Sequence, residues 1–248
     1  MSLPELSGRC AVVTGASRGI GAALAEHFRA AGMNLGLCSR SAPALPEGEH
    51  VVSRELDVSD EAAVEAFTSE VVARFGAIDL WVNNAGVLEP IAPLRDVAIE
   101  DFRRHIDVNL TGVFLGSRCY VRHVRSREGR GVLINVSSGA AWKPYRGWAT
   151  YCAGKAGVER LTQVVAEEEA DSGLRAYSVA PGVVDTAMQE LIRACDLDQF
   201  PDVERFHALK ADDGFNSGEL VARHFLAIAF DPQARPSDVV TEVPFEGG

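Results

Sequence analysis

"CAVVTGASRGIGAALAEHFRA" (residues 10–30) passes from an apolar, β-branched run through a glycine-rich turn into an amphipathic stretch. The apolar run predicts a buried strand, and the amphipathic stretch predicts a helix. Gly15, Gly19 and Gly21 allow a pyrophosphate to approach the backbone of the turn, and the first amides of the helix would face its negative charge. The spacing G-x-x-x-G-x-G differs from the commoner G-x-G-x-x-G. The stretch predicts a strand–turn–helix unit that binds a dinucleotide.

Short strands and longer helices alternate along the rest of the chain. Strands are expected at Cys10–Thr14, Asn34–Cys38, Val51–Leu56, Ile78–Val82, Gly131–Val136 and Leu174–Val179. Helices are expected at Ile20–Ala31, Asp60–Phe75, Ile99–Val124 and Ala149–Ala170. This alternation predicts an α/β fold: a single Rossmann-type domain over residues 1–248, with a doubly wound parallel sheet and helices on both faces. Ligands of such folds bind at the carboxyl ends of the strands.

Composition narrows the class of protein. A net charge of −11 argues against a nucleic-acid partner. No apolar run approaches the roughly 20 residues of a membrane-spanning helix, and "MSLPELSGRC" at the N-terminus has no signal-peptide pattern. We therefore expect a cytoplasmic protein with no membrane partner. The five cysteines lack a C-x-x-C pair and the six histidines lack H-E-x-x-H, so we expect reduced thiols and no metal site.

The second expected strand ends in "GLCSRS" (36–41), where NAD-binding proteins usually carry an acidic residue for the ribose 2′-hydroxyl. Ser39 and Arg40 stand there instead. An arginine can bind a 2′-phosphate with paired hydrogen bonds, and Arg18 in the glycine turn would add a second cation. These residues predict NADP(H) as the cofactor. The alternative is that Arg40 is only a solvated loop cation.

Asp57 follows the third expected strand. Its carboxylate would accept a hydrogen bond from the amino group of adenine. It would equally serve as a helix N-cap together with Ser59 and Asp60, because Asp and Ser are favoured at that position. Residue chemistry leaves both interpretations of Asp57 open.

"ATYCAGKAG" (149–157) places Lys155 one helical turn after Tyr151. A free tyrosine has a pKa near 10, and a nearby lysine would favour the phenolate and lower that pKa toward neutrality. Tyr-x-x-x-Lys alone is also common on solvated helix surfaces. Here it is accompanied by "NNAG" (83–86) and "SSGA" (137–140), each directly after an expected strand. Their amides and hydroxyls would line a reacting carbonyl.

"TGASRGIG", "NNAG", "DVNLTG", "YCAGK" and "PGVVDT" resemble the motifs of the short-chain dehydrogenase/reductase family, in the family's order and over nearly the whole chain. The resemblance implies a catalytic tetrad of Asn109, Ser138, Tyr151 and Lys155. Tyrosine would donate the proton, serine would orient the carbonyl, lysine would bind the nicotinamide ribose, and asparagine would hold a water in the proton relay. The expected NADP(H)-binding residues are Gly15, Ser17, Arg18, Gly19, Ile20, Gly21, Ser39, Arg40, Asp57, Val58, Asn84, Ala85, Gly86, Tyr151, Lys155, Pro181, Gly182, Val184, Thr186 and Met188.

A narrower resemblance links "KPYRGWATYCAGKAG" and "APGVVDTAMQ" to sepiapterin reductase and its bacterial, diketone-reducing relatives. It implies use of NADPH and a hydrogen bond between Val184 and the nicotinamide carboxamide. Expected substrate-binding residues are Ser138, Gly139, Trp148, Tyr151 and Gly182. In sepiapterin reductase an aspartate near the C-terminus anchors the pterin ring. The candidates in this chain are Asp238, Glu242 and Glu246.

A segment at about 187–215 is expected to form a substrate lid that brings Phe200 and Phe206 toward the site. Trp142, Tyr145 and Trp148 precede the catalytic tyrosine. These rings would suit a flat or aryl-bearing substrate, or they would be core or oligomer contacts. The expected helices Ile99–Val124 and Ala149–Ala170 would pack against a second copy in a homodimer or homotetramer.

These observations predict an NADPH-dependent carbonyl reductase whose small-molecule substrate is a ketone or a vicinal diketone. The alternatives are another short-chain alcohol dehydrogenase or a 3-oxoacyl reductase. A non-catalytic NADP(H)-binding redox sensor on the same fold is the hypothesis of a different class.

Overall fold

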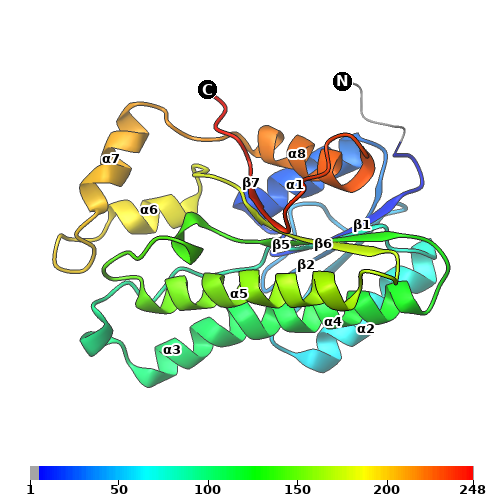
Figure 1. The fold of residues 1–248 in the computed structure, drawn as a ribbon, viewed down its shortest axis with the longest axis horizontal. Helices are drawn as coiled ribbons and strands as arrows, with labels where there is room; N and C mark the ends of the chain where they lie inside the picture. Colours follow the sequence, from blue (N-terminus) through cyan, green and yellow to red (C-terminus); the bar gives the residue numbers. More distant parts are fainter. Residues whose placement is uncertain (1–5, 248) are drawn as a thin grey trace.

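A computed structural model describes residues 6–247 and contains a seven-stranded parallel sheet in the order β3-β2-β1-β4-β5-β6-β7 (Figure 1). The strands are β1 (Cys10–Thr14), β2 (Asn34–Ser39), β3 (Val51–Glu55), β4 (Leu80–Asn83), β5 (Gly131–Val136), β6 (Leu174–Ala180) and β7 (Val240–Glu242). The strand order reverses between β1 and β4, and this switch point is where a doubly wound sheet binds its ligand. The predicted fold class is confirmed.

Helices cover both faces of the sheet (Figure 1). One face carries α1 (Gly19–Ala30) and α8 (Gly218–Phe230), and the other carries α2 (Glu61–Phe75), α4 (Gly112–Arg125) and α5 (Ala149–Glu168). The strands β1, β4 and β5 are buried along their whole length and are mostly apolar, because helices cover both of their faces. No helix within residues 6–247 is both long and apolar enough to cross a membrane.

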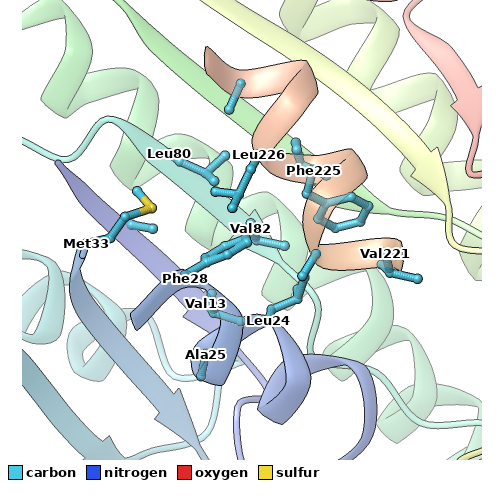
Figure 2. Packing of buried hydrophobic residues seen from close by; sticks show 14 of the residues in the cluster. Val13, Leu24, Ala25, Phe28, Met33, Leu80, Val82, Val221, Phe225 and Leu226 are labelled. Atoms are coloured by element: carbon cyan, nitrogen blue, oxygen red, sulfur yellow. The ribbon is translucent and has the colours of Figure 1, made fainter. Parts of the chain in front are cut away.

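The contact between α1 and α8 fixes the helix that follows the glycine turn. Phe28 on α1 and Phe225 on α8 are fully buried, and they pack over Val13 and Val82 of the sheet (Figure 2). Burying a phenylalanine side chain stabilises the fold by about 1.5–3 kcal/mol. This packing holds the N-terminal end of α1 beside the carboxyl end of β1.

The single helix expected at Ile99–Val124 is divided into three parts. The helix α3 (Ile99–Ile106) leads into a π-helical turn at Asp107–Thr111, and α4 follows without a break. The π-helical turn carries Asn109. A π-helical turn inserts about one extra residue, which changes the direction of the side chains without interrupting the apolar pattern. The prediction of one regular helix was therefore wrong in this detail.

The C-terminal third contains elements that the strand and helix predictions missed. The edge strand β7 pairs with β6 over only three residues. Earlier in the chain, β4 starts at Leu80, two residues later than expected. Between β6 and α8 the chain forms α6 (Ala187–Arg193) and α7 (Val203–Ala211), which stand off the sheet at the left of Figure 1. They make up most of the segment expected to be the lid.

Candidate active site

A cavity of about 740 Å³ lies at the carboxyl edge of the sheet. Every residue predicted to bind cofactor or substrate lines it, from Gly15 in the glycine turn to Met188 in α6. Of the predicted tetrad, Ser138, Tyr151 and Lys155 line the cavity, whereas Asn109 is fully buried behind it. The structure therefore brings together motifs that are up to about 170 residues apart in sequence, because parallel strands place their following loops along one edge.

The glycine turn is held between two other loops. A Cβ atom on Gly15 would lie 2.7 Å from the Cα of Ala85, and a Cβ on Gly19 would lie 3.1 Å from Thr186. The side-chain amide of Asn84 donates to the backbone oxygens of Thr14 at 2.9 Å and of Gly15 at 3.2 Å. Side chains on these glycines would fill the cradle, so the residues present fit the pyrophosphate of a dinucleotide.

Ser39, Arg40 and Asp57 line the cavity, and Arg40 is near enough to Asp57 for its charge to act on that carboxylate. Oδ1 of Asp57 accepts from the backbone N and the hydroxyl of Ser59, at 2.9 and 2.7 Å. The N-cap of α2 is Asp60, so capping is not the function of Asp57. Partial burial acts to raise the pKa of Asp57, but the hydrogen bonds from Ser59 and the charge of Arg40 outweigh it and lower the pKa below its usual value. Asp57 is thus a carboxylate acceptor at neutral pH.

Tyr151 and Lys155 are buried side by side on α5. Lys155 Nζ donates to the backbone oxygen of Val136 at 2.8 Å and lies 5.8 Å from the centre of the Tyr151 ring. Burial lowers the pKa of Lys155 from 10.5 to about 8. Burial also raises the pKa of Tyr151, and its side-chain hydrogen bond with Ser138 offsets only part of this rise. Lys155 does not contribute to this rise, so the expected lowering of the tyrosine pKa by Lys155 stays a prediction.

Ser138 is placed by its own turn. It precedes the short 3₁₀ helix at Gly139–Ala141, and its hydroxyl oxygen accepts from the backbone N of Ala140 at 3.2 Å. The hydroxyl proton is not used in that contact. Ser138 can therefore donate a hydrogen bond toward the cavity, as orientation of a carbonyl oxygen requires.

Asn109 is locked by three hydrogen bonds. Its amide accepts from Val87 N at 3.0 Å and donates to Val87 O at 2.8 Å and to His105 Nε2 at 2.7 Å. His105 in turn donates from Nδ1 to the backbone oxygen of Glu89 at 2.8 Å. Burial, with a smaller contribution from the charge of Lys155, lowers the pKa of His105, so the ring is neutral. Both amide hydrogens of Asn109 are used within the protein, and its role in holding a water stays a prediction.

His105 was missed by sequence reasoning. It lies four residues before Asn109, and residues at this spacing face each other on a helix. Its ring also meets the Tyr151 ring edge-on, with the ring centres 5.9 Å apart. The i, i+4 spacing was the available signal, but a histidine inside an amphipathic helix is usually a packing residue.

Aromatic side chains line the cavity around Tyr151. Trp148 meets Tyr151 edge-on with the ring centres 5.6 Å apart, and it stacks on Phe200 at 4.4 Å. Trp148, Tyr145 and Phe206 line the cavity, whereas Phe200 is fully buried behind them. The five rings considered from the sequence therefore differ in their roles. Phe200 is a core residue, Trp142 is half-exposed and does not line the cavity, and the remaining three rings line it.

Among the three acidic residues considered near the C-terminus, only Glu242 lines the cavity. The carboxylate of Glu246 accepts from the backbone N and the hydroxyl of Ser217, at 2.6 and 3.0 Å. Asp238 accepts from its neighbour Ser237. Glu246 therefore stabilises the start of α8, and neither it nor Asp238 lines the site. Within residues 6–247, no three His, Cys, Asp or Glu side chains gather in a way that would hold a metal ion.

Comparison with known proteins places these features in a family. A family model described as short chain dehydrogenase matches residues 9–196. The 3beta-hydroxysteroid dehydrogenase 1 of Eggerthella lenta is 42% identical over 191 residues, which cover 73% of each chain. The benzil reductase ((S)-benzoin forming) of Bacillus subtilis is 31% identical over 224 residues, covering 88% of this chain and 91% of that protein. The crystal structure of the KRED1-Pglu enzyme aligns with a TM-score of 0.84 at 34% identity, over 93% of this chain and 98% of the other.

Proposed function

The chain belongs to the short-chain dehydrogenase family and is an oxidoreductase of carbonyl or alcohol substrates; on that basis we propose that it is an NADPH-dependent carbonyl reductase. The observation that carries this proposal is the burial of Tyr151 at the cavity wall, beside Ser138 and with Lys155 Nζ 5.8 Å from its ring centre. A complete proton-donating group of this kind argues for catalysis and against a redox sensor that only binds cofactor.

Proton delivery is the part of the reaction that this chain performs. NADPH, when bound, supplies the hydride that forms the new C–H bond at the carbonyl carbon. Ser138 donates a hydrogen bond that orients the carbonyl oxygen, and Tyr151 transfers its phenolic proton to that oxygen. The raised pKa of Tyr151 keeps the donor protonated before substrate arrives. The resulting phenolate recovers a proton from solvent, and the ammonium of Lys155 stabilises its charge in the meantime.

The preference for NADPH over NADH rests on the residues around the end of β2. Arg40 and Arg18 both line the cavity, and no acidic side chain directly follows β2. Two guanidinium groups favour a 2′-phosphate by charge-assisted hydrogen bonds, and a carboxylate at Ser39 or Arg40 would repel it. Asp57 faces the same part of the cavity and would bind the adenine amino group.

We propose a flat or aryl-bearing ketone or vicinal diketone as the substrate. Trp148, Tyr145 and Phe206 supply ring surfaces beside Tyr151, and α6 and α7 would close over them as the lid. Similarity to a benzil reductase supports a diaryl diketone. The motifs that resemble those of sepiapterin reductase support a second substrate class, a pterin with a carbonyl on its side chain. Glu242 is the one acidic candidate that lines the cavity and would anchor the pterin ring.

A second candidate function is oxidation of a secondary alcohol in the reverse direction. The similarity to a 3beta-hydroxysteroid dehydrogenase favours it, because that relative is the more nearly identical in sequence over its aligned region. The two functions use the same residues and differ in substrate and direction. NADPH oxidation with benzil and diacetyl, compared with NADP⁺ reduction by alicyclic secondary alcohols, separates them. Turnover of no carbonyl in a broad panel would contradict the proposed reductase activity.

We also propose a homodimer formed through α4 and α5. Leu110, Phe114 and Leu161 line an apolar groove on the outer side of these helices. Phe114 is 43% exposed and Val164 on the same pair of helices is 45% exposed. A second copy that packs its α4 and α5 into this groove would bury them by a two-fold symmetric contact.

A further inference from the structure

Helix α5 carries a buried carboxylate, that of Glu159, which does not line the cavity. Glu159 lies two helical turns beyond Tyr151, is 9% exposed and does not line the cavity. One carboxylate oxygen accepts from the hydroxyl of Ser137 at 2.7 Å, and the other accepts from the indole N–H of Trp142 at 2.7 Å. A buried carboxylate is costly unless donors satisfy it, and these two bonds are as short as charge-assisted hydrogen bonds usually are.

The two donors flank Ser138 in the chain. Ser137 directly precedes it, and Trp142 follows it by four residues, beyond the 3₁₀ turn at Gly139–Ala141. Trp142 is 49% exposed, which is unusual for so large an apolar side chain. The hydrogen bond to Glu159 gives a reason for its orientation. Glu159 therefore binds the start and the end of the loop that carries Ser138.

The two ends of this loop are not held equally. The backbone N of Ser137 donates to Val179 O at 2.9 Å, so the sheet fixes that end independently. Near Trp142, the other hydrogen bond to α5 within the described residues is a long one, from the Cys152 thiol to Lys143 O at 3.7 Å. A thiol is a weak donor, so the indole bond to Glu159 is the stronger tie at that end.

We propose that Glu159 is a positioning residue, which holds Ser138 at a fixed place relative to Tyr151 by clamping both ends of the Ser138 loop to the helix that carries Tyr151. This inference rests on the proposed carbonyl reduction, in which both side chains must meet one oxygen atom. Glu159 acts through Ser138 and touches neither substrate nor cofactor. A displacement of about 1 Å in such a constellation can cost about 100-fold in rate.

The test is a double-mutant cycle with NADPH and benzil as the probe substrates. Glu159→Gln leaves an oxygen for one donor and turns an amide N–H toward the other. We expect kcat to fall on the order of 10- to 100-fold, with the KM for NADPH unchanged. In a Ser138→Ala background the same change should cause no further loss, because Glu159 has no other route to the reaction. A loss of equal size in both backgrounds, or no loss in either, would overturn the proposal.

Single-bond variants keep the test usable if Glu159→Gln does not fold. Trp142→Phe and Ser137→Ala each remove one donor and leave the carboxylate in place. Because the sheet already fixes Ser137, we expect the larger fall in kcat from Trp142→Phe, and equal or reversed effects would contradict the proposed clamping by Glu159.

If Ser138→Ala itself leaves kcat unchanged, the proposed function and this inference both fail. If Ser138→Ala lowers kcat and the variants at Glu159, Ser137 and Trp142 do not, only the inference fails.

Glu169 provides a matched control. It is also a buried glutamate, at the C-terminal end of α5, and it pairs with Arg125 at 2.8 Å. Glu169→Gln should lower the melting temperature through loss of that pair and leave kcat unchanged. A fall in kcat equal to that of Glu159→Gln would show that any buried glutamate on α5 has the same effect, and it would contradict a specific role for Glu159.

Discussion

Lys155 Nζ lies 5.8 Å from the centre of the Tyr151 ring, and both side chains are buried on the same face of α5. Burial lowers the lysine pKa to about 8 and raises the tyrosine pKa, so the protein environment disfavours the charged form of each. The tyrosine is thereby kept as a proton donor. The lysine carries a free-energy penalty for the same burial, which has a measurable consequence.

Lys155→Met should stabilise the protein at neutral pH. The lysine titrates at 10.5 in the unfolded chain and at about 8 in the fold. Between these values the unfolded state binds more protons, so the free energy of unfolding of the wild type rises with pH. The penalty is fully present below pH 8, where it is on the order of 3 kcal/mol, and it vanishes by about pH 10.5. The stability advantage of Lys155→Met should therefore be largest at pH 6–7 and fade between pH 8 and 10.

Thermal unfolding of both proteins across this pH range measures the difference directly. Comparison between the two removes the contributions of the other titrating groups. A Lys155→Met protein that is less stable than the wild type at pH 7, or a difference that does not change with pH, would show that burial does not lower the lysine pKa.

Arg40→Ala should raise the KM for NADPH on the order of 10- to 100-fold, because hydrogen bonds to a charged group contribute about 1.5–3 kcal/mol. The KM for NADH should not rise, since NADH has no 2′-phosphate. Arg95→Ala is the control, because Arg95 is exposed and does not line the cavity. An unchanged KM for NADPH in Arg40→Ala would show that Arg40 is only a solvated loop cation.

Asn216→Ala should weaken both the fold and cofactor binding. The Asn216 amide donates to Pro181 O at 3.1 Å and to Pro244 O at 3.2 Å, and it accepts from Glu246 N at 2.9 Å. It is buried, so its loss leaves backbone groups unpaired at a cost of about 1–3 kcal/mol each. We expect lower stability and a higher KM for NADPH, because Pro181 lies in the loop that lines the cavity.

Asn34→Ala is the comparison for Asn216→Ala, since the Asn34 side chain pairs with His50 at the surface. It should have little effect on either quantity. If Asn216→Ala loses stability but its KM for NADPH is unchanged, then the Asn216 hydrogen bonds support the fold without shaping the loop that contains Pro181.

Phe114→Glu should convert the proposed homodimer to a monomer, because it places a charge in the apolar groove between α4 and α5. Light scattering coupled to size exclusion gives the mass of each species. Leu94→Glu, at a residue that is even more exposed and does not line that groove, should leave the oligomer intact. A wild-type monomer, or dissociation by Leu94→Glu alone, would contradict an interface on these helices.

The sequence predicted that the glycine turn, "NNAG" and Ser138 would lie close together, because each follows a strand. Parallel strands align the loops after β1, β4 and β5 at one edge, so the glycine turn, "NNAG" and Ser138 had to meet. The spacing of Tyr151 and Lys155 placed both on one helical face. These predictions need only strand order and helical periodicity.

Other features depend on contacts that periodicity does not contain. A glutamate such as Glu159 on a long helix is ordinarily solvated, and it is buried here only because residues 137–142 fold back over α5. The π-helical turn at Asp107–Thr111 keeps the apolar pattern while it turns Asn109 toward Val87. The strand β7 is three residues long and is defined by its pairing with β6. Tertiary context decides each of these.

The central claim is that the Tyr151 hydroxyl delivers the proton. Tyr151→Phe removes that single oxygen atom, and Tyr177→Phe is the matched control because Tyr177 is also 7% exposed but lies outside the cavity. The decisive measurement is kcat for benzil reduction together with the dissociation constant for NADPH. We predict that Tyr151→Phe lowers kcat by about 10²–10⁴-fold with NADPH affinity unchanged, while Tyr177→Phe keeps wild-type turnover. Turnover by Tyr151→Phe close to that of the wild type would contradict the claim.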